Sequence, residues 1–361
     1  MKSLVVGGYG AVGRTLTREL TNAVDCPDQV DIAGRDGRKA RTFASNFGDA
    51  VSGVTVDLQD TSSYDAVLED VDQVVVCIDQ TGTAFVEACL ERGIDYIDVT
   101  ASDEFFRQVE HLDELAKTTG STAMLSVGLA PGITNLLATQ GIERLSNVSS
   151  VRIGILLGLG ETFGPAASRW TLERIGREYT VGTEDGPQTI RGFSDPKRMA
   201  FPEHGCRIAY TFDFADQHAL IRTLDVPRVK TRLCFDSRAF TGAIYWLSRC
   251  GLYRPMCEAL GFDRVATIAS ELPVGGDTFV AAVETEGLSG SKPSIVTNSI
   301  VGSEQSHATA IVAASVATAT RTESVPDGVY HIHEVLDADP IFDVLAERGY
   351  RFTETESVFT G

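Results

Sequence analysis

Short apolar runs alternate with longer amphipathic stretches over the first 128 residues. The apolar runs are rich in β-branched residues, as is typical of strands buried on both faces, and the stretches between them have the apolar spacing of helices. Regular alternation of strands and helices predicts a parallel sheet with right-handed crossovers. We therefore predict an α/β fold with a doubly wound sheet. The predicted strands are Ser3–Val6, Val30–Ala33, Val51–Val56, Val74–Ile78, Tyr96–Val99 and Thr122–Val127, and the predicted helices are Arg14–Ala23, Arg38–Phe47, Ser62–Leu68, Ala84–Arg92 and Glu104–Thr118.

The pattern changes after about residue 130, where strands and helices no longer alternate regularly. This irregular order of strands and helices predicts a second, α+β domain over residues 131–302 with a mixed or antiparallel sheet. A helix over Glu304–Ala319 is rich in alanine and is expected to pack tightly, so we predict that residues 303–361 return to the first domain, 1–130. The predicted strands here are Val151–Leu159, Arg207–Phe214, Val229–Phe235, Thr278–Glu284 and Ser294–Ile300, and the predicted helices are Ile133–Leu145, Ala166–Glu178 and Phe240–Leu260.

The composition is strongly acidic and poor in lysine. The chain of 361 residues carries a formal net charge of −19, and only 6 of its 31 basic residues are lysines. Such a surface repels nucleic acids and anionic membranes, because both require a basic footprint. An acid-rich, lysine-poor surface is also typical of halophilic proteins, in which concentrated salt screens the repulsion between carboxylates, although an ordinary acidic protein has the same composition.

The spacing of the cysteines and the length of the apolar runs indicate the cellular location of the protein. Seven cysteines, Cys26 among them, form no C-x-x-C pair, which favours reduced thiols in a cytoplasmic protein over disulfides or a zinc site. No apolar stretch reaches the roughly 18 residues that cross a membrane. We expect a cytoplasmic homodimer that binds a small-molecule substrate, with no nucleic acid, membrane or metal partner.

A glycine-rich loop follows the first predicted strand and precedes the first predicted helix. Its G-x-G-x-x-G pattern consists of Gly8 for a tight turn, Gly10 for close approach of a pyrophosphate and Gly13 for packing of the helix on the strand. The helix N-terminus then offers free N–H groups to the anion. This context predicts a Rossmann-type dinucleotide site rather than glycines that serve packing alone. The predicted cofactor-binding residues of the loop are Gly7, Gly8, Tyr9, Gly10, Ala11, Val12 and Gly13.

The ends of the second and fourth strands supply further cofactor candidates. Arg35 follows the second strand and is suited to a forked contact with the 2′-phosphate of NADP, whereas Asp36 is suited to the ribose hydroxyls of NAD. We favour NADP and keep NAD as the alternative. Asp79 and Thr81 follow the fourth strand, where they either contact the nicotinamide ribose or belong to an ordinary strand–helix turn.

Candidates for chemistry lie at strand ends and among aromatic residues. By their positions at strand ends, we place Asp98, Thr100 and Ser126 near the cofactor crevice at the carboxyl edge of the sheet. Asp98 is a candidate acid or base. Its alternative role is to cap a helix or to make a strand-end hydrogen bond. His204 is a second candidate acid or base. Arg169 and Arg207 are candidates for binding a substrate carboxylate, but most arginines in so acidic a chain pair with surface carboxylates. His331 and His333 are expected on one face of a strand, without the third ligand that a metal requires.

Several segments resemble the saccharopine dehydrogenase-like family, in the branch with saccharopine reductase and carboxynorspermidine dehydrogenase. They are LVVGGYGAVGRTL, AGRD, ACLERGIDYIDVT and SVGLAPGITNLLA, with GVYHIHEVLDADPIFDVLAERGY resembling the end of the family. The resemblance implies an NAD(P)-binding oxidoreductase fold. The family's turn G-L-D-P-G-x-D has lost both acids here, to Ala130 and Thr134, so the saccharopine reaction itself is not implied.

Two functions remain open at this point. One is a dehydrogenase or reductase that transfers hydride to or from a small polar or carboxylated substrate held between the domains. The other is a non-catalytic NAD(P)-binding redox sensor or interaction protein, which the loss of the two acids favours. A complete second domain favours the oxidoreductase, since a sensor has no need of a substrate domain.

Overall fold

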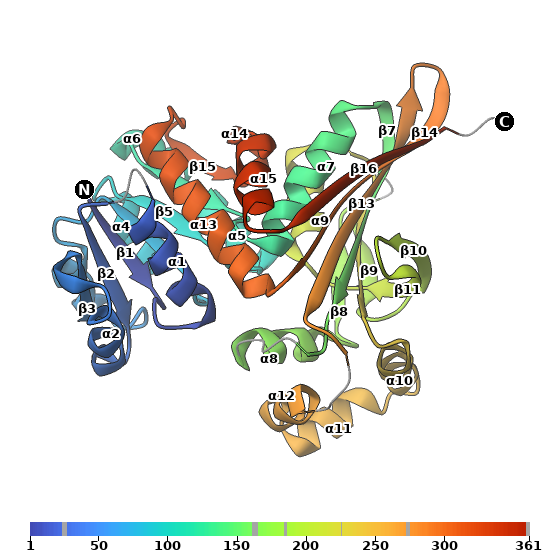
Figure 1. The fold of residues 1–361 in the computed structure, drawn as a ribbon, viewed down its shortest axis with the longest axis horizontal. Coiled ribbons are helices and arrows are strands. Elements are labelled where there is room, and N and C mark those ends of the chain that lie inside the picture. The colour runs from blue at the N-terminus through green and yellow to red at the C-terminus, as the bar shows by residue number, and fades with distance from the viewer. Residues whose placement is uncertain (24–26, 161–164, 184–185, 225, 272–274, 359–361) are drawn as a thin grey trace. The chain divides into compact units, whose positions relative to one another are not determined.

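The computed structural model shows two compact units and describes residues 1–23, 27–160, 165–183, 186–224, 226–271 and 275–358 (Figure 1). The first unit comprises residues 1–133 and 306–344, and the second comprises residues 134–305 and 345–361. Cys26 lies outside the described residues. No helix in the described ranges is both long and apolar enough to span a bilayer.

The first unit is built on a seven-stranded sheet in the order β15-β6-β5-β4-β1-β2-β3, with every neighbouring pair parallel. Strand order reverses direction beside β1, as in doubly wound folds, and the carboxyl ends of the strands meet at one edge. The strands are β1 Lys2–Val6, β2 Gln29–Gly34, β3 Val51–Thr55, β4 Gln73–Val76, β5 Asp95–Asp98, β6 Thr122–Leu125 and β15 Gly328–His331.

Buried apolar side chains hold helices against this sheet. β4 and β6 are buried along their whole length, because helices cover both faces of the sheet. The alanine-rich helix α13 packs tightly here: Gln73 Nε2 on β4 donates to the carbonyl of Ala317 at 3.0 Å. The helices of this unit are α1 Ala11–Asn22, α2 Gly37–Ala44, α3 Tyr64–Leu68, α4 Ala84–Leu90, α5 Asp103–Glu110, α6 Asp113–Thr119, α13 Gln305–Thr322 and α14 Ile332–Val335, with α15 Ala338–Glu347 crossing the boundary.

The second unit contains a mixed seven-stranded sheet in the order β10-β11-β12-β7-β13-β14-β16, and β8 and β9 form a separate ribbon. Only β12 and β7 are parallel among the paired strands described in this sheet. The strands are β7 Ser146–Leu157, β8 Glu178–Val181, β9 Gln188–Arg191, β10 Lys197–Phe201, β11 Gly205–Thr211, β12 Val229–Phe235, β13 Thr278–Ser289, β14 Lys292–Ser303 and β16 Arg351–Val358. The helices are α7 Thr134–Glu143, α8 Pro165–Arg174, α9 Ala215–Thr223, α10 Arg238–Arg249, α11 Tyr253–Leu260 and α12 Phe262–Glu271.

Three predictions about the elements are wrong. The segment 303–361 does not return to the first unit as a whole, because β16 pairs antiparallel with β14 of the second sheet. The helices predicted over Glu104–Thr118 and Phe240–Leu260 are each two helices, α5 with α6 and α10 with α11. The strand predicted through His333 ends at His331, which caps α14; the backbone N–H of His331 donates to Glu334 Oε2 at 2.8 Å.

Candidate functional site

The glycine loop joins β1 to α1 and depends on the absence of side chains at two positions. Gly7 has a φ of +79°, in the left-handed region that favours glycine. A Cβ on Gly13 would lie 2.4 Å from the carbonyl oxygen of Gly7, so this position allows α1 to pack on the loop. The tight turn expected at Gly8 is therefore made at Gly7, while Gly8 itself packs closely on Ile32 of β2.

The N-terminus of α1 is open to an anion. Gly10 is the N-cap residue and supplies no side chain to satisfy the first N–H groups, and the first turn contains no acidic residue. Gly10 and Ala11 are exposed to solvent. An exposed, uncapped helix start presents unpaired N–H donors and the positive end of the helix dipole, which is the arrangement that binds phosphate.

The two charged residues after β2 have different environments. Arg35 is exposed, and within the described ranges its guanidinium makes no hydrogen bond or ion pair. Asp36 caps α2: its Oδ1 accepts from the N–H groups of Arg38 at 3.0 Å and Lys39 at 3.1 Å, and these bonds lower the pKa of its carboxyl. The Tyr9 hydroxyl accepts from the Asp36 N–H at 3.2 Å, so the loop side chain lies over the end of β2.

A buried polar cluster lies at the carboxyl ends of β4 and β5. Asp98 is the last residue of β5, and its Oδ2 accepts from the Tyr96 hydroxyl and, at 2.9 Å, from Gln80 Nε2. Gln80 Nε2 also donates to the Tyr96 hydroxyl oxygen, and the Thr100 N–H donates to Asp98 Oδ1 at 2.6 Å. The Gln80 Oε1 atom is buried without a hydrogen-bond partner among the described residues.

Burial raises the pKa of both acidic groups in this cluster. Removal from solvent raises the pKa of Asp98 to about 6, and the hydrogen bonds from Tyr96 and Thr100 oppose the rise. The same burial, with Asp98 beside it, raises the pKa of the Tyr96 hydroxyl well above its ordinary value. A carboxyl group that titrates near neutrality at a strand end is suited to proton transfer. Tyr96 and Asp98 are two residues apart on a strand, so the period of two was the sequence signal for Tyr96.

Asp79 and Thr81 are exposed in the segment between β4 and α4. α4 begins at Ala84 after the N-cap residue Thr83, whose hydroxyl donates to Glu87 Oε1 at 2.5 Å and makes no cap to the backbone. Asp79 is one of the charges near Asp98 and helps to raise the pKa of Asp98. Both candidates therefore lie beside the polar cluster, and their contact with a cofactor stays a prediction.

Sequence reasoning missed the partners of His331. The Ser126 Oγ lies 2.7 Å from His331 Nδ1, and His331 Nε2 lies 3.0 Å from Glu110 Oε1 on α5. The Glu110 carboxylate can only accept a hydrogen bond. A neutral His331 therefore donates to it from Nε2 and accepts a hydrogen bond from the Ser126 hydroxyl at Nδ1. Ser126 has a φ of +56° and is buried just after β6. This chain of hydrogen bonds ties the ends of β6 and β15 to α5, and no sequence motif joined residues so far apart.

The candidates of the second unit do not come together in one cluster. Arg169 Nε donates to Glu173 at 2.6 Å and its Nη1 lies 3.3 Å from Asp263, which is the surface pairing kept as its alternative. His204 lies in the β10–β11 hairpin turn, where its N–H donates to the Phe201 carbonyl at 3.1 Å. Arg207 is on β11 with a buried Nε that has no hydrogen-bond partner among the residues described. Their roles with a substrate remain predictions.

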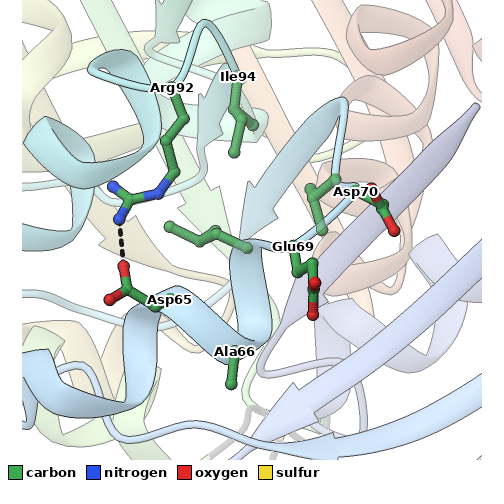
Figure 2. A pocket seen from close by; sticks show the side chains of 8 residues that line it. Asp65, Ala66, Glu69, Asp70, Arg92 and Ile94 are labelled. Carbon is green, nitrogen blue, oxygen red and sulfur yellow. Dashed lines mark hydrogen bonds and ion pairs between the residues drawn. The ribbon is translucent and has the colours of Figure 1, made fainter.

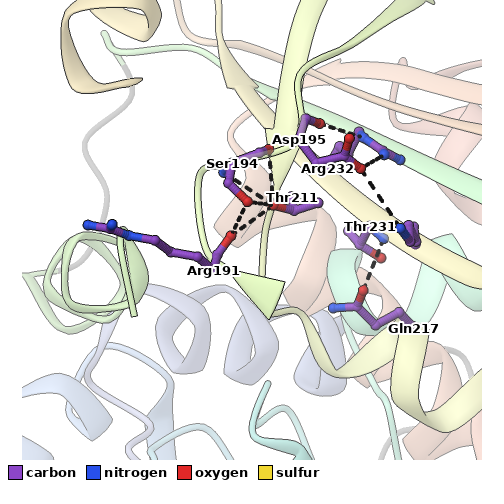
Figure 3. Close-up of polar contacts among 8 residues, drawn as sticks. Arg191, Ser194, Asp195, Thr211, Gln217, Thr231 and Arg232 are labelled. Carbon is purple, nitrogen blue, oxygen red and sulfur yellow. Dashed lines mark hydrogen bonds and ion pairs between the residues drawn. The ribbon is translucent and has the colours of Figure 1, made fainter. Parts of the chain in front are cut away.

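The polar network that the second unit does contain is satisfied internally (Figure 3). Arg232 Nη2 donates to Asp195 Oδ2 at 2.6 Å, and the Thr211 hydroxyl donates to the carbonyl of Arg191 at 3.0 Å. Next to it, buried Asp216 accepts from the hydroxyls of Thr231 at 2.6 Å and Thr134 at 2.9 Å. Thr134 replaces an acid of the family's turn, and here its hydroxyl is held by Asp216.

A cavity of about 500 Å³ in the first unit is lined by neither the glycine loop nor the Asp98 cluster (Figure 2). Its lining residues precede β4 and β5, at the amino edge of the sheet, and include Asp65 paired with Arg92. None of the glycine-loop residues lines it. No group of three metal-ligating side chains occurs within the described ranges.

Comparisons with known proteins bear on the first unit and on the fold. Residues 4–124 match the family model of the saccharopine dehydrogenase NADP-binding domain. Carboxyaminopropylagmatine dehydrogenase of Synechocystis is 23% identical over 287 residues, covering 73% of this chain and 67% of that protein.

Two solved structures share the fold over nearly the whole chain. Apo saccharopine dehydrogenase (L-Glu forming) of Saccharomyces cerevisiae has a TM-score of 0.68 at 16% identity and covers 99% of this chain and 100% of its own. Homospermidine synthase of Legionella pneumophila, in complex with NAD, has a TM-score of 0.65 at 14% identity, covering 99% of this chain and 92% of its own. Residues 4–124 are therefore similar to the saccharopine dehydrogenase NADP-binding domain, and the fold of nearly the whole chain is similar to that of these two solved structures.

Proposed function

We propose that this protein is an NADP-dependent oxidoreductase that transfers hydride to or from a small polar or carboxylated substrate. One observation carries the proposal: the uncapped, exposed start of α1 lies beside β2, whose end presents the exposed Arg35. The pyrophosphate of a dinucleotide requires the first feature, and a 2′-phosphate requires a cation such as the second.

The residues present fit the cofactor. The N–H groups that follow Gly10 would hold the pyrophosphate, and the absence of an acidic side chain in the first turn of α1 leaves that charge unopposed. The orphaned Gln80 Oε1 at the end of β4 is an acceptor suited to an amide N–H such as that of a nicotinamide carboxamide. When bound, the nicotinamide supplies the hydride donor or acceptor.

The preference for NADP rests on the contrast between Arg35 and Asp36. A carboxylate that selects NAD accepts the ribose hydroxyls, but Asp36 Oδ1 already accepts two N–H groups at the start of α2. The exposed guanidinium of Arg35 is available to fork around a phosphate. The matching family is named for NADP, while the Legionella structure contains NAD, so the comparisons support a nicotinamide dinucleotide of either kind.

The proton that accompanies hydride transfer is assigned to the Asp98 cluster. Asp98 has a pKa of about 6 and is held by Tyr96 and Gln80 at the strand ends where a doubly wound sheet binds its ligands. Related proteins are named for saccharopine and for carboxyaminopropylagmatine as substrates. We infer a small substrate of similar polarity, with a binding mode altered at Ala130 and Thr134.

Titration of the full chain with NADPH and with NADH, followed by cofactor fluorescence, tests the proposal. Arg35→Ala is expected to weaken NADPH by about 1.5–3 kcal/mol and to leave NADH nearly unchanged, since only NADPH loses a charged hydrogen bond. Arg38→Ala is the matched control, because Arg38 is also exposed at the start of α2. Equal losses for both cofactors would contradict a role of Arg35 with the phosphate.

A non-catalytic NADP-binding sensor is the second candidate, and the missing acids at Ala130 and Thr134 favour it. Both candidates predict NADPH binding. Only the oxidoreductase predicts that a substrate mixture of amino acids and keto acids produces turnover that Asp98→Asn abolishes. NADPH binding without any turnover would favour the sensor.

A further inference from the structure

The first two helices carry positive charge in a chain that is acidic overall. Between residues 3 and 91 the sequence has six basic residues, and all of them lie on α1, just after β2 or on α2. The side chain of each is exposed to solvent. We call these six residues the basic surface: Arg14, Arg18, Arg35, Arg38, Lys39 and Arg41.

Contacts between the two helices bring the charges of α1 to the side where α2 lies. The guanidinium carbons of Arg14 and Arg18 lie 5.1 Å and 5.9 Å from the centre of the Phe43 ring on α2. Arg14 Nε also donates to the carbonyl of Tyr9 at 2.7 Å, and the hydroxyl of Tyr9 accepts from the Asp36 N–H. The start of α1, the glycine loop and the start of α2 are therefore joined by direct contacts.

The start of α2 gathers the remaining charges. Asp36 caps this helix, and the pKa of its carboxyl is lowered by the Lys39 N–H and further by the positive charges of Lys39 and Arg38. Arg41 Nη1 lies at the same end of the helix, 3.1 Å from the place that a Cβ on Gly37 would occupy. Because α2 begins where β2 ends, these charges lie at the carboxyl edge of the sheet, beside the glycine loop.

No carboxylate pairs with a cation of the basic surface within the described part of the chain. Other exposed arginines of the first unit do have such partners: Arg92 pairs with Asp65, and Arg107 pairs with Asp103 at 2.9 Å. Pairing is the usual state of an arginine in so acidic a chain, so six neighbouring cations without a carboxylate partner are an exception that calls for an anion from outside.

The acidic residues described in the same segment have other partners or another direction. Asp31 is buried on β2 and pairs with Lys2 Nζ at 3.0 Å, and Asp28 pairs with the N-terminal amine. Glu19 follows Arg18 on α1 and is therefore turned from it by about 100° around the helix axis. The basic surface thus keeps its positive charge.

Unpaired charge of this kind acts on a dissolved anion before contact. The net charge of −19 repels an anion from the chain as a whole. In about 0.1–0.15 M salt, however, the Debye length is only about 8–10 Å, so the charges nearest to the anion decide the sign of the force. NADPH carries about two more negative charges than NADH because of its 2′-phosphate, and it is attracted more strongly.

We propose that the basic surface captures the phosphates of the dinucleotide from solution and guides them to the start of α1. This inference rests on the proposed cofactor function. It gives Arg18 and Arg41, which are not among the residues proposed to hold the bound cofactor, a role in the rate of association alone. Electrostatic guidance raises association rates by roughly 10- to 1,000-fold. A nucleic acid is a poorer occupant, because its length would extend it over the acidic remainder of the protein.

The test is stopped-flow mixing of the full chain with NADPH and with NADH, followed by cofactor fluorescence between about 0.1 and 0.5 M potassium chloride. The association rate of NADPH is expected to fall as salt rises. The logarithm of the rate should fall about twice as steeply for NADPH as for NADH, since the charge on NADPH is about twice as large. The net charge of the chain alone predicts the opposite sign, because salt would then screen a repulsion.

The variant Arg18→Gln with Arg41→Gln is expected to lower the NADPH association rate about fivefold in about 0.1 M salt, with an unchanged dissociation rate and unchanged circular dichroism. Arg92→Gln with Arg107→Gln is the matched control, because it removes two positive charges from the same unit at positions that have carboxylate partners. Its association rate should stay within about 1.5-fold of the wild type.

A single charge of the basic surface is worth only about twofold in this rate. Arg38→Ala therefore remains a useful control in the equilibrium titration, where Arg35→Ala is expected to have a far larger effect.

Three outcomes would overturn the proposal. One is a wild-type association rate for NADPH that is constant or rises with salt, and another is a double variant that associates as fast as its control. The third is a loss that occurs in the dissociation rate, because Arg18 and Arg41 would then hold the bound cofactor. A single-stranded oligonucleotide that binds the wild type but not the double variant, while NADPH association is equal in both, would assign the surface to nucleic acid instead.

Equilibrium titration keeps this test separate from the proposed function. If neither NADPH nor NADH binds, the proposed function itself is contradicted. If both bind and their association rates respond neither to salt nor to the double substitution, only the role of the basic surface is contradicted.

Discussion

Two fully buried aspartates, one in each unit, have the same burial and different surroundings. Asp216 at the start of α9 accepts from two threonine hydroxyls and from the N–H of Gln217 at 2.7 Å. Asp98 at the end of β5 shares its partner Gln80 with Tyr96, and that glutamine retains an orphaned oxygen. Burial raises the pKa of both carboxyls.

Burial and a raised pKa are common to both carboxyls, so these two properties do not decide which of them takes part in the proposed proton transfer. Asp216 ties α9 to β12 and α7 through neutral donors of its own unit, as expected of a buried group that is fully satisfied. Asp98 lies at the strand edge where doubly wound sheets bind ligands, beside an acceptor that has no partner. Its place in the topology and the orphaned Gln80 oxygen beside it distinguish Asp98 from Asp216, and they support the proposed role of Asp98.

The largest expected effect is at Asp216. Asp216→Ala removes the acceptor of three buried donors and should cost about 3–5 kcal/mol in the free energy of unfolding. Urea unfolding measures this loss. NADPH affinity of the folded variant should stay at the wild-type value, and a loss of binding without a loss of stability would reverse the roles assigned to the two aspartates.

The next effect is the pH dependence at Asp98. Its pKa is about 6 in the folded protein against 3.8 for an ordinary aspartate, so the neutral form is favoured by folding. The stabilisation is complete below about pH 4 and is lost as the pH rises through 6, by about 3 kcal/mol in all. The free energy of unfolding of the wild type, relative to Asp98→Asn, should therefore fall between about pH 4 and pH 7. A difference that is constant with pH would contradict the raised pKa.

A smaller effect separates binding from packing in the glycine loop. Gly10 has ordinary dihedral angles, and a Cβ there would lie 3.1 Å from Gly7 O, which is a tight contact but milder than the 2.4 Å that a Cβ at Gly13 would have to the same oxygen. Gly10→Val should weaken NADPH on the order of 100-fold, about 2.7 kcal/mol, with only a small loss of melting temperature. Gly13→Ala should lower the melting temperature more. If both variants melted alike, the distinction between the two glycines would fail.

The smallest effect concerns the surface rather than the buried aspartates. If the acidic, lysine-poor surface is an adaptation to salt, molar potassium chloride should screen its repulsion and raise the melting temperature, at roughly 2–4 °C for each kcal/mol gained. Calorimetry across a salt series measures this. A melting temperature that is flat or falls with salt would refute the halophilic interpretation.

Local sequence patterns predicted the strands and helices of the first unit well, because each of these elements is marked by residues within its own segment. Continuous apolar runs gave the parallel strands, and the spacing of Gly8, Gly10 and Gly13 placed the loop between β1 and α1. Asp98 was placed at the sheet edge because strand ends meet there, and its role as an acid or base stays a prediction. The predicted substrate site between the domains remains a prediction.

The rest depended on contacts between distant residues. His331 is more than 200 residues away in sequence from each of its partners, Ser126 and Glu110. No local period in the sequence connects residues at that separation. The pairing of β16 with β14 also leaves no signal in either segment. In the second unit, residue type alone suggested Arg169 and His204, and the structure places them in surface ion pairs and a hairpin turn.

A crystal structure of the full chain with NADP⁺ bound tests the proposed cofactor site. We expect the pyrophosphate at the start of α1, the 2′-phosphate within about 3 Å of the Arg35 guanidinium and the nicotinamide beside Gln80 and Asp98. A dinucleotide bound elsewhere, or a nicotinamide directed away from Asp98, would contradict it.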